Sequence, residues 1–264
     1  MSLTGRRGQT TADSLALEDL ADSLGLHVVA GFSFYKDPWL SSVFEDEDAL
    51  TREFVEAATD GRAGTRYGVF GEIGTSLDEI TPTEESQLRA AARAQQETGL
   101  AISTHCTLGT MALEQAAALD LAGADLDRVI IGHLDLEPDI DYLVRVIESG
   151  VNIAFDTFGK EWFDYSPPDA EGPEGQQVRH RYNRPDRDRI AALVELCEMG
   201  YAGRILLSCD MSGEEAWLNP ETHGTHGYSY LPLVVIPQLR EQGVPEDSIR
   251  QMLVDNPARV LAVP

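Results

Sequence analysis

The feature that most constrains this chain is a regular alternation of short apolar runs with longer helical patterns. Several of the runs are continuous and rich in Val and Ile, which is typical of strands buried on both faces of a parallel sheet. Such an alternation predicts a parallel α/β architecture. The expected strands are 27–35, 67–75, 100–105, 128–134, 151–158 and 204–210.

Helical patterns fill the intervals between these runs. Pro82 and the acidic residues after it suit the start of a helix. Gly99, Gly150 and Gly200 each follow a helical pattern and precede a strand, as C-terminal caps do. The expected helices are 15–24, 49–58, 83–98, 110–122, 140–149 and 187–199, with a closing helix at 245–261.

The number of units predicts an incomplete barrel. A closed (β/α)8 barrel of the TIM type has eight strands, whereas six strand–helix units are visible here. The chain opens on a polar stretch followed at once by a helix, with no strand expected before it. We therefore expect an α/β chain of the TIM-barrel class that lacks its first two strands and forms one domain over residues 1–264. The long connection 159–186 follows a strand, where barrel enzymes keep substrate loops.

The composition limits the classes of binding partner and the cellular compartment that we expect for this protein. With 45 acidic and 20 basic residues, the formal net charge is -25, which argues against a nucleic-acid partner. No apolar run is long enough to cross a membrane, and no secretory signal is visible, so a cytoplasmic location is expected. The three cysteines form no C-x-x-C pair. Lysine is rare, with only Lys36 and Lys160, which a high-salt cell or a GC-rich genome would each explain.

Four polar residues lie at the ends of separate apolar runs: Glu72, His105, His133 and Asp210. The carboxyl ends of barrel strands meet at one mouth, so these side chains are expected to converge. Taken singly, a strand histidine is more often a hydrogen-bonded core residue, and a strand-terminal Asp usually caps the next helix. Together, carboxylates and imidazoles suit zinc, manganese or a similar divalent ion, and we favour a metal site.

The motifs around these residues resemble those of the phosphotriesterase family. The resemblance runs in order and without a break from about residue 12 to the end. Residues 28–35 are similar to the family's third strand, and residues 256–259 to its C-terminal helix motif. The site motifs are 71–76 (GEIGTS), 103–105 (STH), 131–133 (IGH) and 207–210 (LSCD).

What this resemblance implies is a binuclear centre of the amidohydrolase type. Glu72 takes the place of the family's bridging carboxylate, and His105 and His133 match the ligands of the more exposed metal. Asp210 matches an aspartate that contacts the other metal and handles the proton of the bridging hydroxide. The implied reaction is hydrolysis of a lactone, carboxylic ester or phosphoester by a metal-bound hydroxide. Amide cleavage is a further alternative.

The chain departs from the family in one respect. The family's first strand carries a His-x-His pair that binds the first metal, and this sequence contains no such pair. A missing N-terminal piece is the simplest explanation, and natural loss in a degenerate paralogue is the other. The expected cofactor is a divalent ion, with zinc foremost, bound as two ions if that pair exists and as one otherwise. The rival hypothesis is an impaired remnant that binds at most one metal and serves as an interaction protein.

Loop residues supply the candidate substrate contacts, although packing of long loops would explain the aromatic ones equally well. A replacement metal pair, His223 and His226, is disfavoured because loop ligands would need their own supporting contacts. We expect a small-molecule substrate, no nucleic-acid or membrane partner and, from the family alone, a homodimer. The residues assigned to substrate binding are Trp162, Trp217, His223, His226 and Tyr228.

Overall fold

The computed structural model describes most of the chain. The described residues are 2–5, 11–38, 40, 46–62, 64–136, 138–160, 185–211 and 226–263.

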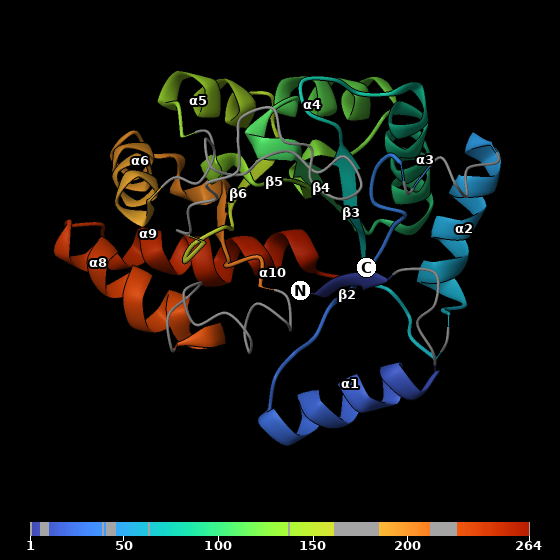
Figure 1. The fold of residues 1–264 in the computed structure, drawn as a ribbon, viewed down its shortest axis with the longest axis horizontal. Coiled ribbons are helices and arrows are strands. Elements are labelled where there is room, and N and C mark those ends of the chain that lie inside the picture. The colour runs from blue at the N-terminus through green and yellow to red at the C-terminus, as the bar shows by residue number, and fades with distance from the viewer. Residues whose placement is uncertain are drawn as a thin grey trace, which may run out of the picture.

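One sheet of seven strands organises the molecule, and its strands lie side by side in chain order. Every neighbouring pair is parallel, and helices connect the strands over the outside of the sheet (Figure 1). The predicted parallel α/β class is confirmed. The strands are β1 (Ser2–Gly5), β2 (Ala30–Phe32), β3 (Val69–Thr75), β4 (Ala101–Cys106), β5 (Val129–Gly132), β6 (Asn152–Phe155) and β7 (Ile205–Leu207).

The first strand corrects the sequence analysis. β1 pairs with β2, with Ser2 opposite Ala30 and Gly5 opposite Phe32. The expectation that no strand precedes the first helix was therefore wrong. A four-residue segment of Ser, Leu, Thr and Gly has no apolar run, so its pairing with β2 is invisible in the local pattern.

Most helices overlap the predicted intervals, and the predicted caps are present, but α8 was not predicted and the predicted closing helix 245–261 is divided into α9 and α10. At the start of α3, the Thr81 side chain accepts a hydrogen bond from the backbone N–H of Glu84. In return, the Glu84 carboxylate accepts a hydrogen bond from the backbone N–H of Thr81. Gly99 ends this helix with a φ of 70°. The helices are α1 (Thr11–Leu24), α2 (Glu47–Thr59), α3 (Pro82–Thr98), α4 (Ala112–Leu121), α5 (Ile140–Glu148), α6 (Asp186–Glu198), α8 (Ile236–Glu241), α9 (Glu246–Arg250) and α10 (Asn256–Leu261).

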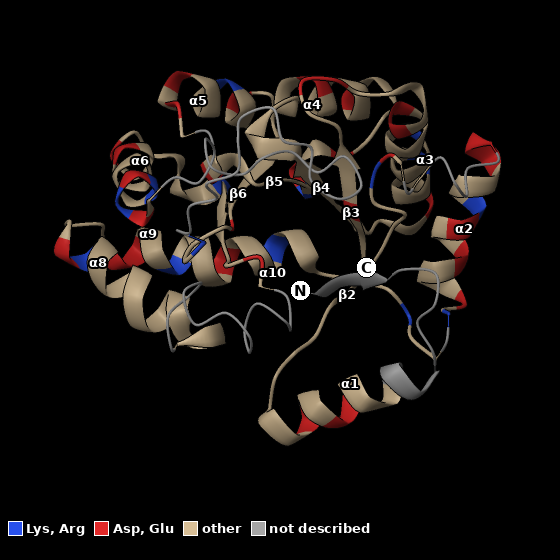
Figure 2. Cartoon of the chain, viewed as in Figure 1, with Lys and Arg blue, Asp and Glu red and all other residues tan. Residues whose placement is uncertain are grey.

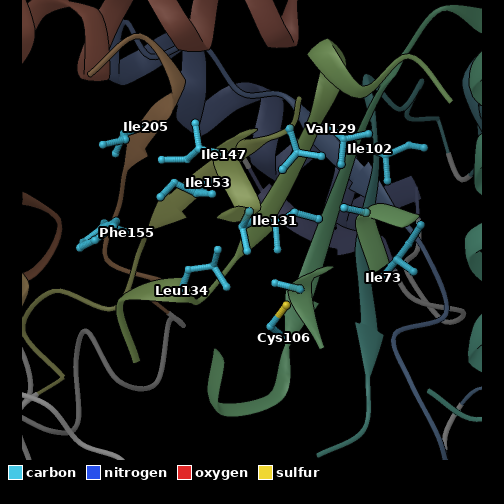
Figure 3. Close-up of a cluster of buried hydrophobic side chains, with 14 of the residues drawn as sticks. Ile73, Ile102, Cys106, Val129, Ile131, Leu134, Ile147, Ile153, Phe155 and Ile205 are labelled. Atoms are coloured by element: carbon cyan, nitrogen blue, oxygen red, sulfur yellow. The ribbon is translucent and has the colours of Figure 1, made fainter. Parts of the chain in front are cut away.

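The strands bury side chains on both of their faces, as their continuous apolar runs predicted. One set packs against the surrounding helices, and Figure 3 shows part of it: Ile73, Ile102, Ile131, Ile153 and Ile205. Their neighbours on the other face form a second cluster, which Val260 of α10 covers: Val69, Ala101, Ile130, Ala154 and Leu206.

Charge lies mainly on the outside of the helices. Figure 2 shows the positions of Asp and Glu residues, in red, along α2, α4, α5 and α6 at the periphery of the molecule. Within the part of the chain that the structure describes, no helix combines the length and the apolar character needed to cross a membrane.

Candidate metal centre

Three of the predicted ligands meet at the carboxyl ends of adjacent strands. Glu72 lies on β3, His105 on β4, and His133 directly after β5. Glu72 Oε1 is 2.7 Å from His133 Nε2 and 3.2 Å from His105 Nδ1. One donor atom from each residue lies within 4.8 Å of the others. The sheet therefore brings a carboxylate and two imidazoles together in one small volume.

Close backbone contact sets the position of His133. A Cβ added to Gly132 would lie 2.3 Å from the backbone oxygen of Thr104 on β4, so only glycine fits before the histidine. His133 itself has a φ of 62°, in the left-handed region that costs a non-glycine residue about 1 kcal/mol or more. Such a conformation at the end of a strand turns the imidazole toward the neighbouring strands.

Asp156, at the end of β6, fixes the orientation of the His133 ring. Asp156 Oδ1 accepts from the backbone N–H of His133 at 3.0 Å and lies 2.8 Å from His133 Nδ1. Because an ionised carboxylate can only accept hydrogen bonds, His133 must carry a proton on Nδ1. The Nε2 lone pair of a neutral His133 therefore faces Glu72, in the carboxylate–histidine arrangement that usually supports a metal ligand.

A hydroxyl group fixes the second imidazole. Thr107 Oγ1 donates to the backbone oxygen of Thr75 at 2.6 Å, and it lies 3.2 Å from His105 Nε2. A hydroxyl has one proton, so the contact to His105 uses an oxygen lone pair and places the proton on Nε2. His105 Nδ1 is then free to face Glu72. The Tyr35 hydroxyl also approaches His105 Nε2, at 3.2 Å.

The protonation of the three groups reflects their mutual contacts. Burial favours a higher pKa for Glu72, but the charge and hydrogen bonds of His105 and His133 outweigh it and hold this pKa well below its ordinary value. Burial lowers the pKa of His105. At His133 burial acts in the same direction, yet the carboxylates of Asp156 and Glu72 outweigh it and raise the pKa well above its ordinary value. The centre thus holds a carboxylate that is balanced by positive charge.

This donor set fits a divalent cation. Donor atoms around a tetrahedral zinc ion lie roughly 3.3 Å apart, given metal–ligand distances of about 2.0–2.1 Å. The two distances from Glu72 Oε1, 2.7 Å and 3.2 Å, are close to that spacing. A cation would replace the proton on His133 as the partner of Glu72, and two histidines with one carboxylate are a common set for divalent metals.

Asp210 lies apart from the three-residue cluster. It follows β7, has a φ of 41°, and forms an ion pair with Lys160. Its side chain is 44% exposed, compared with 19% for Glu72. The group of potential ligands found among the described residues contains Glu72, His105 and His133 but not Asp210. Its roles as a metal ligand and proton acceptor stay predictions.

The predicted substrate residues are only partly described. Trp162, Trp217 and His223 lie outside the described residues. His226 is exposed, and its ring centroid is 6.3 Å from that of Tyr230. Tyr228 is 72% exposed. Their contact with a substrate stays a prediction.

Sequence reasoning missed Asp156, Tyr35 and Thr107. Asp156 follows the apolar strand β6 as Asp210 follows β7, so the same strand-end criterion would have found it. Tyr35 ends the expected strand 27–35, and Thr107 lies two residues beyond His105. Neither carries a local signal for a role at this site.

Comparison with known proteins places the chain among hydrolases. The model of the phosphotriesterase family matches residues 8–261. The phosphotriesterase homology protein of Escherichia coli is 35% identical over 245 residues, which cover 91% of this chain and 76% of that protein. The N-acetyltaurine hydrolase of Dictyostelium discoideum is 33% identical over 258 residues, which cover 95% of this chain and 66% of that protein. The chain therefore spans about two thirds to three quarters of these relatives.

Solved structures agree with the sequence comparison. The E. coli phosphotriesterase homology protein, crystallised with phosphate in its active site, has a TM-score of 0.81 at 33% identity and covers 98% of this chain and 82% of that one. A variant of a Deinococcus radiodurans phosphotriesterase-like lactonase has a TM-score of 0.80 at 29% identity, and the match covers 97% of this chain and 79% of that one. The TIM-barrel class and the resemblance found in the motifs are confirmed. From the family match, the conserved fold and the sequence identity together, this chain belongs to the phosphotriesterase family of hydrolases.

Proposed function

We propose that this chain is a divalent-metal-dependent hydrolase that acts on an ester, lactone or phosphoester. The observation that carries the proposal is the meeting of Glu72, His105 and His133 at one end of the parallel sheet. Each imidazole turns one ring nitrogen toward Glu72 while its other nitrogen contacts Asp156 or Thr107, and a cation would replace the protons between these nitrogens and the carboxylate. This arrangement is prepared for a cation, whereas three unrelated polar core residues would not need such oriented support.

The proposed ion is zinc, which imidazole and carboxylate ligands suit. A divalent cation at this site would lower the pKa of a bound water toward neutrality and would polarise the scissile carbonyl or phosphoryl oxygen. Glu72, His105 and His133 would hold it, and the described residues supply ligands for one ion. A second ion requires a His-x-His pair, which this sequence does not contain.

The remaining roles follow from position. Asp210 lies at the carboxyl end of β7, on the same side of the sheet as the cluster, and we assign it the proton released by the attacking water. Lys160 orients its carboxylate through their ion pair. The substrate-contacting residues are assigned to the loops after β6 and β7, where barrel enzymes place specificity: Trp162, Trp217, His223, His226 and Tyr228.

A second candidate is amide hydrolysis. It is favoured by the relatives named N-acetyltaurine hydrolase, one of which, from humans, is 30% identical over 94% of this chain. The same metal and the same proton acceptor would serve an amide or an ester, because both have a carbonyl centre. The rival proposal remains an impaired paralogue that binds at most one ion and acts as an interaction protein.

We further propose that the protein is cytoplasmic, consists of one domain and forms a homodimer.

The test combines metal content with turnover. The purified protein is reconstituted with zinc or manganese, its metal per chain is measured, and hydrolysis is assayed on esters, lactones, phosphoesters and amides. We expect bound metal and turnover, both lost in His105→Ala and retained in His27→Ala, which removes an exposed histidine. A folded, metal-loaded protein that turns over none of these compounds would refute the hydrolase and support the impaired paralogue.

A further inference from the structure

Both lysines of this acidic chain follow the carboxyl ends of strands, and Lys36 lies close to the candidate metal centre. Lys160 follows β6 and is paired with Asp210. Lys36 follows Tyr35 beyond the end of β2, and its Nζ donates to Thr107 Oγ1 at 2.6 Å. This is the hydroxyl that contacts His105 Nε2 at 3.2 Å. The Lys36 ammonium is therefore one hydroxyl group away from a proposed metal ligand.

The fold holds Lys36 in this place through its backbone. Two side chains of α3 bind the segment: Gln87 Nε2 donates to the Tyr35 oxygen at 2.7 Å, and Glu84 Oε1 accepts from the Asp37 N–H at 3.2 Å. Tyr35 has a φ of 66°, which breaks the alternation of an extended strand. As a result, the Tyr35 and Lys36 side chains, although consecutive, both reach the His105 side of the centre.

The stem of Lys36 is also fitted to the sheet. A Cβ added to Gly74 of β3 would lie 2.9 Å from the Lys36 Cβ, so the glycine leaves room for the lysine to lie against the strand. Burial lowers the pKa of Lys36 against the opposing influence of Glu84 and Glu72. The structure thus keeps a lysine half-buried at a place where its charge is costly.

Lys36 differs from Lys160 in its partner. Among the described residues, no carboxylate lies within ion-pair distance of Lys36, and its one direct acceptor is the neutral Thr107 hydroxyl. An ammonium carries three donors, so two remain beyond the one that Thr107 receives. A half-buried ammonium with spare donors beside a metal centre is suited to an oxyanion group of a ligand.

We propose that Lys36 binds an anionic tail of the substrate, so that the enzyme selects acylated small molecules that carry a carboxylate or a sulfonate. This inference rests on the proposed hydrolase function. In a chain of net charge -25, an anionic substrate needs a local cation to be held at the centre. Lys36 supplies that cation on the His105 side, and its charge makes it a specificity-determining residue.

The experiment compares two esters that differ only in charge. Hydrolysis of 2-acetoxyethanesulfonate and of ethyl acetate is measured with metal-loaded wild type, Lys36→Gln and Lys36→Arg. We expect Lys36→Gln to raise KM for the sulfonate ester about ten-fold or more, as loss of a charge-assisted contact does, with little change for ethyl acetate. Lys36→Arg should restore part of the difference. Arg250→Gln removes the same charge from an exposed helix and should change neither ester.

A binding measurement separates this inference from the proposed function. Ethanesulfonate, which cannot be hydrolysed, is titrated calorimetrically into the metal-loaded wild type, Lys36→Gln and Arg250→Gln. We expect binding to the wild type and to Arg250→Gln, weakened about ten-fold in Lys36→Gln. Equal binding to wild type and Lys36→Gln, or no binding to either, overturns the role of Lys36 even if ethyl acetate is hydrolysed. Binding that depends on Lys36 without turnover of either ester supports the anion site and refutes the hydrolase.

Discussion

Replacing Asp156 by Asn tests whether the carboxylate behind His133 serves the metal. An amide oxygen can still accept from the His133 backbone N–H and Nδ1–H, which now lie 3.0 Å and 2.8 Å from Asp156 Oδ1. The geometry should therefore persist, and mainly the negative charge is lost. Loss of such a supporting carboxylate weakens metal binding about 10–100-fold. Because the hydrogen bonds remain, we expect the low end, about ten-fold or roughly 1.4 kcal/mol.

The pH dependence sharpens this prediction. The Asp156 carboxylate raises the pKa of His133, so in the wild type a proton competes with the metal over a wider pH range. Asp156→Asn should lower that pKa and relieve part of the competition. The affinity ratio of wild type to variant should then grow as the pH rises from 6 to 8. Zinc affinity is measured by competition with a chromophoric chelator at each pH.

The control is Asp120→Asn, which removes the same charge from an exposed position on α4. It should bind zinc as the wild type does at every pH. Circular dichroism and thermal unfolding establish that Asp156→Asn is folded before its affinity is measured. Zinc affinity equal to that of the wild type at pH 8 would contradict the assigned orientation of His133 and the role of its carboxylate partner.

Three further predictions concern the centre and its support. Because its raised pKa keeps His133 protonated in the metal-free protein at neutral pH, zinc binding should release about one proton per ion, fewer as the pH rises through that pKa; calorimetry in buffers of different ionisation enthalpy counts them. Gly132→Ala should lower stability by about 1–3 kcal/mol in urea unfolding, because its Cβ would meet the Thr104 oxygen, and unchanged stability would refute that contact. Arg189→Met should cost about 3–5 kcal/mol in the same assay, because buried Asp135 would lose its cation; a neutral effect would show that the ion pair is dispensable.

The fold was predictable where a local run of apolar residues reflects burial of the strand in the folded protein. The expected strands 67–75 and 100–105 became β3 and β4 with shifts of one or two residues, because their side chains are buried on both faces. The expected strand 27–35 shortened to β2, since Val28 is 39% exposed and the chain beyond Phe32 bonds to Gln87 of α3. That bond depends on a residue more than fifty positions away, which periodicity cannot register.

The site was predictable only as far as its residues lie on apolar strands. Glu72 and His105 stand out because a polar side chain in such a run is costly unless it has a partner. The partners themselves are tertiary: Thr107 fixes a histidine tautomer through a hydroxyl whose proton goes to another strand. Lys36 reaches the centre because Tyr35 adopts a positive φ, and the local sequence does not predict this conformation.

Charges on the surface and charges at the centre differ in how strongly they act on a bound substrate. Exposed acids farther from the centre than the Debye length of about 8 Å are largely screened at physiological ionic strength. Lys36, one hydroxyl away from His105, lies where screening is weakest. The exposed acids therefore act weakly on charge at the centre, whereas Lys36 acts on a bound substrate at short range. Of the two lysines in this chain, Lys160 is paired with Asp210, whereas Lys36 places its positive charge where an anion would meet the metal.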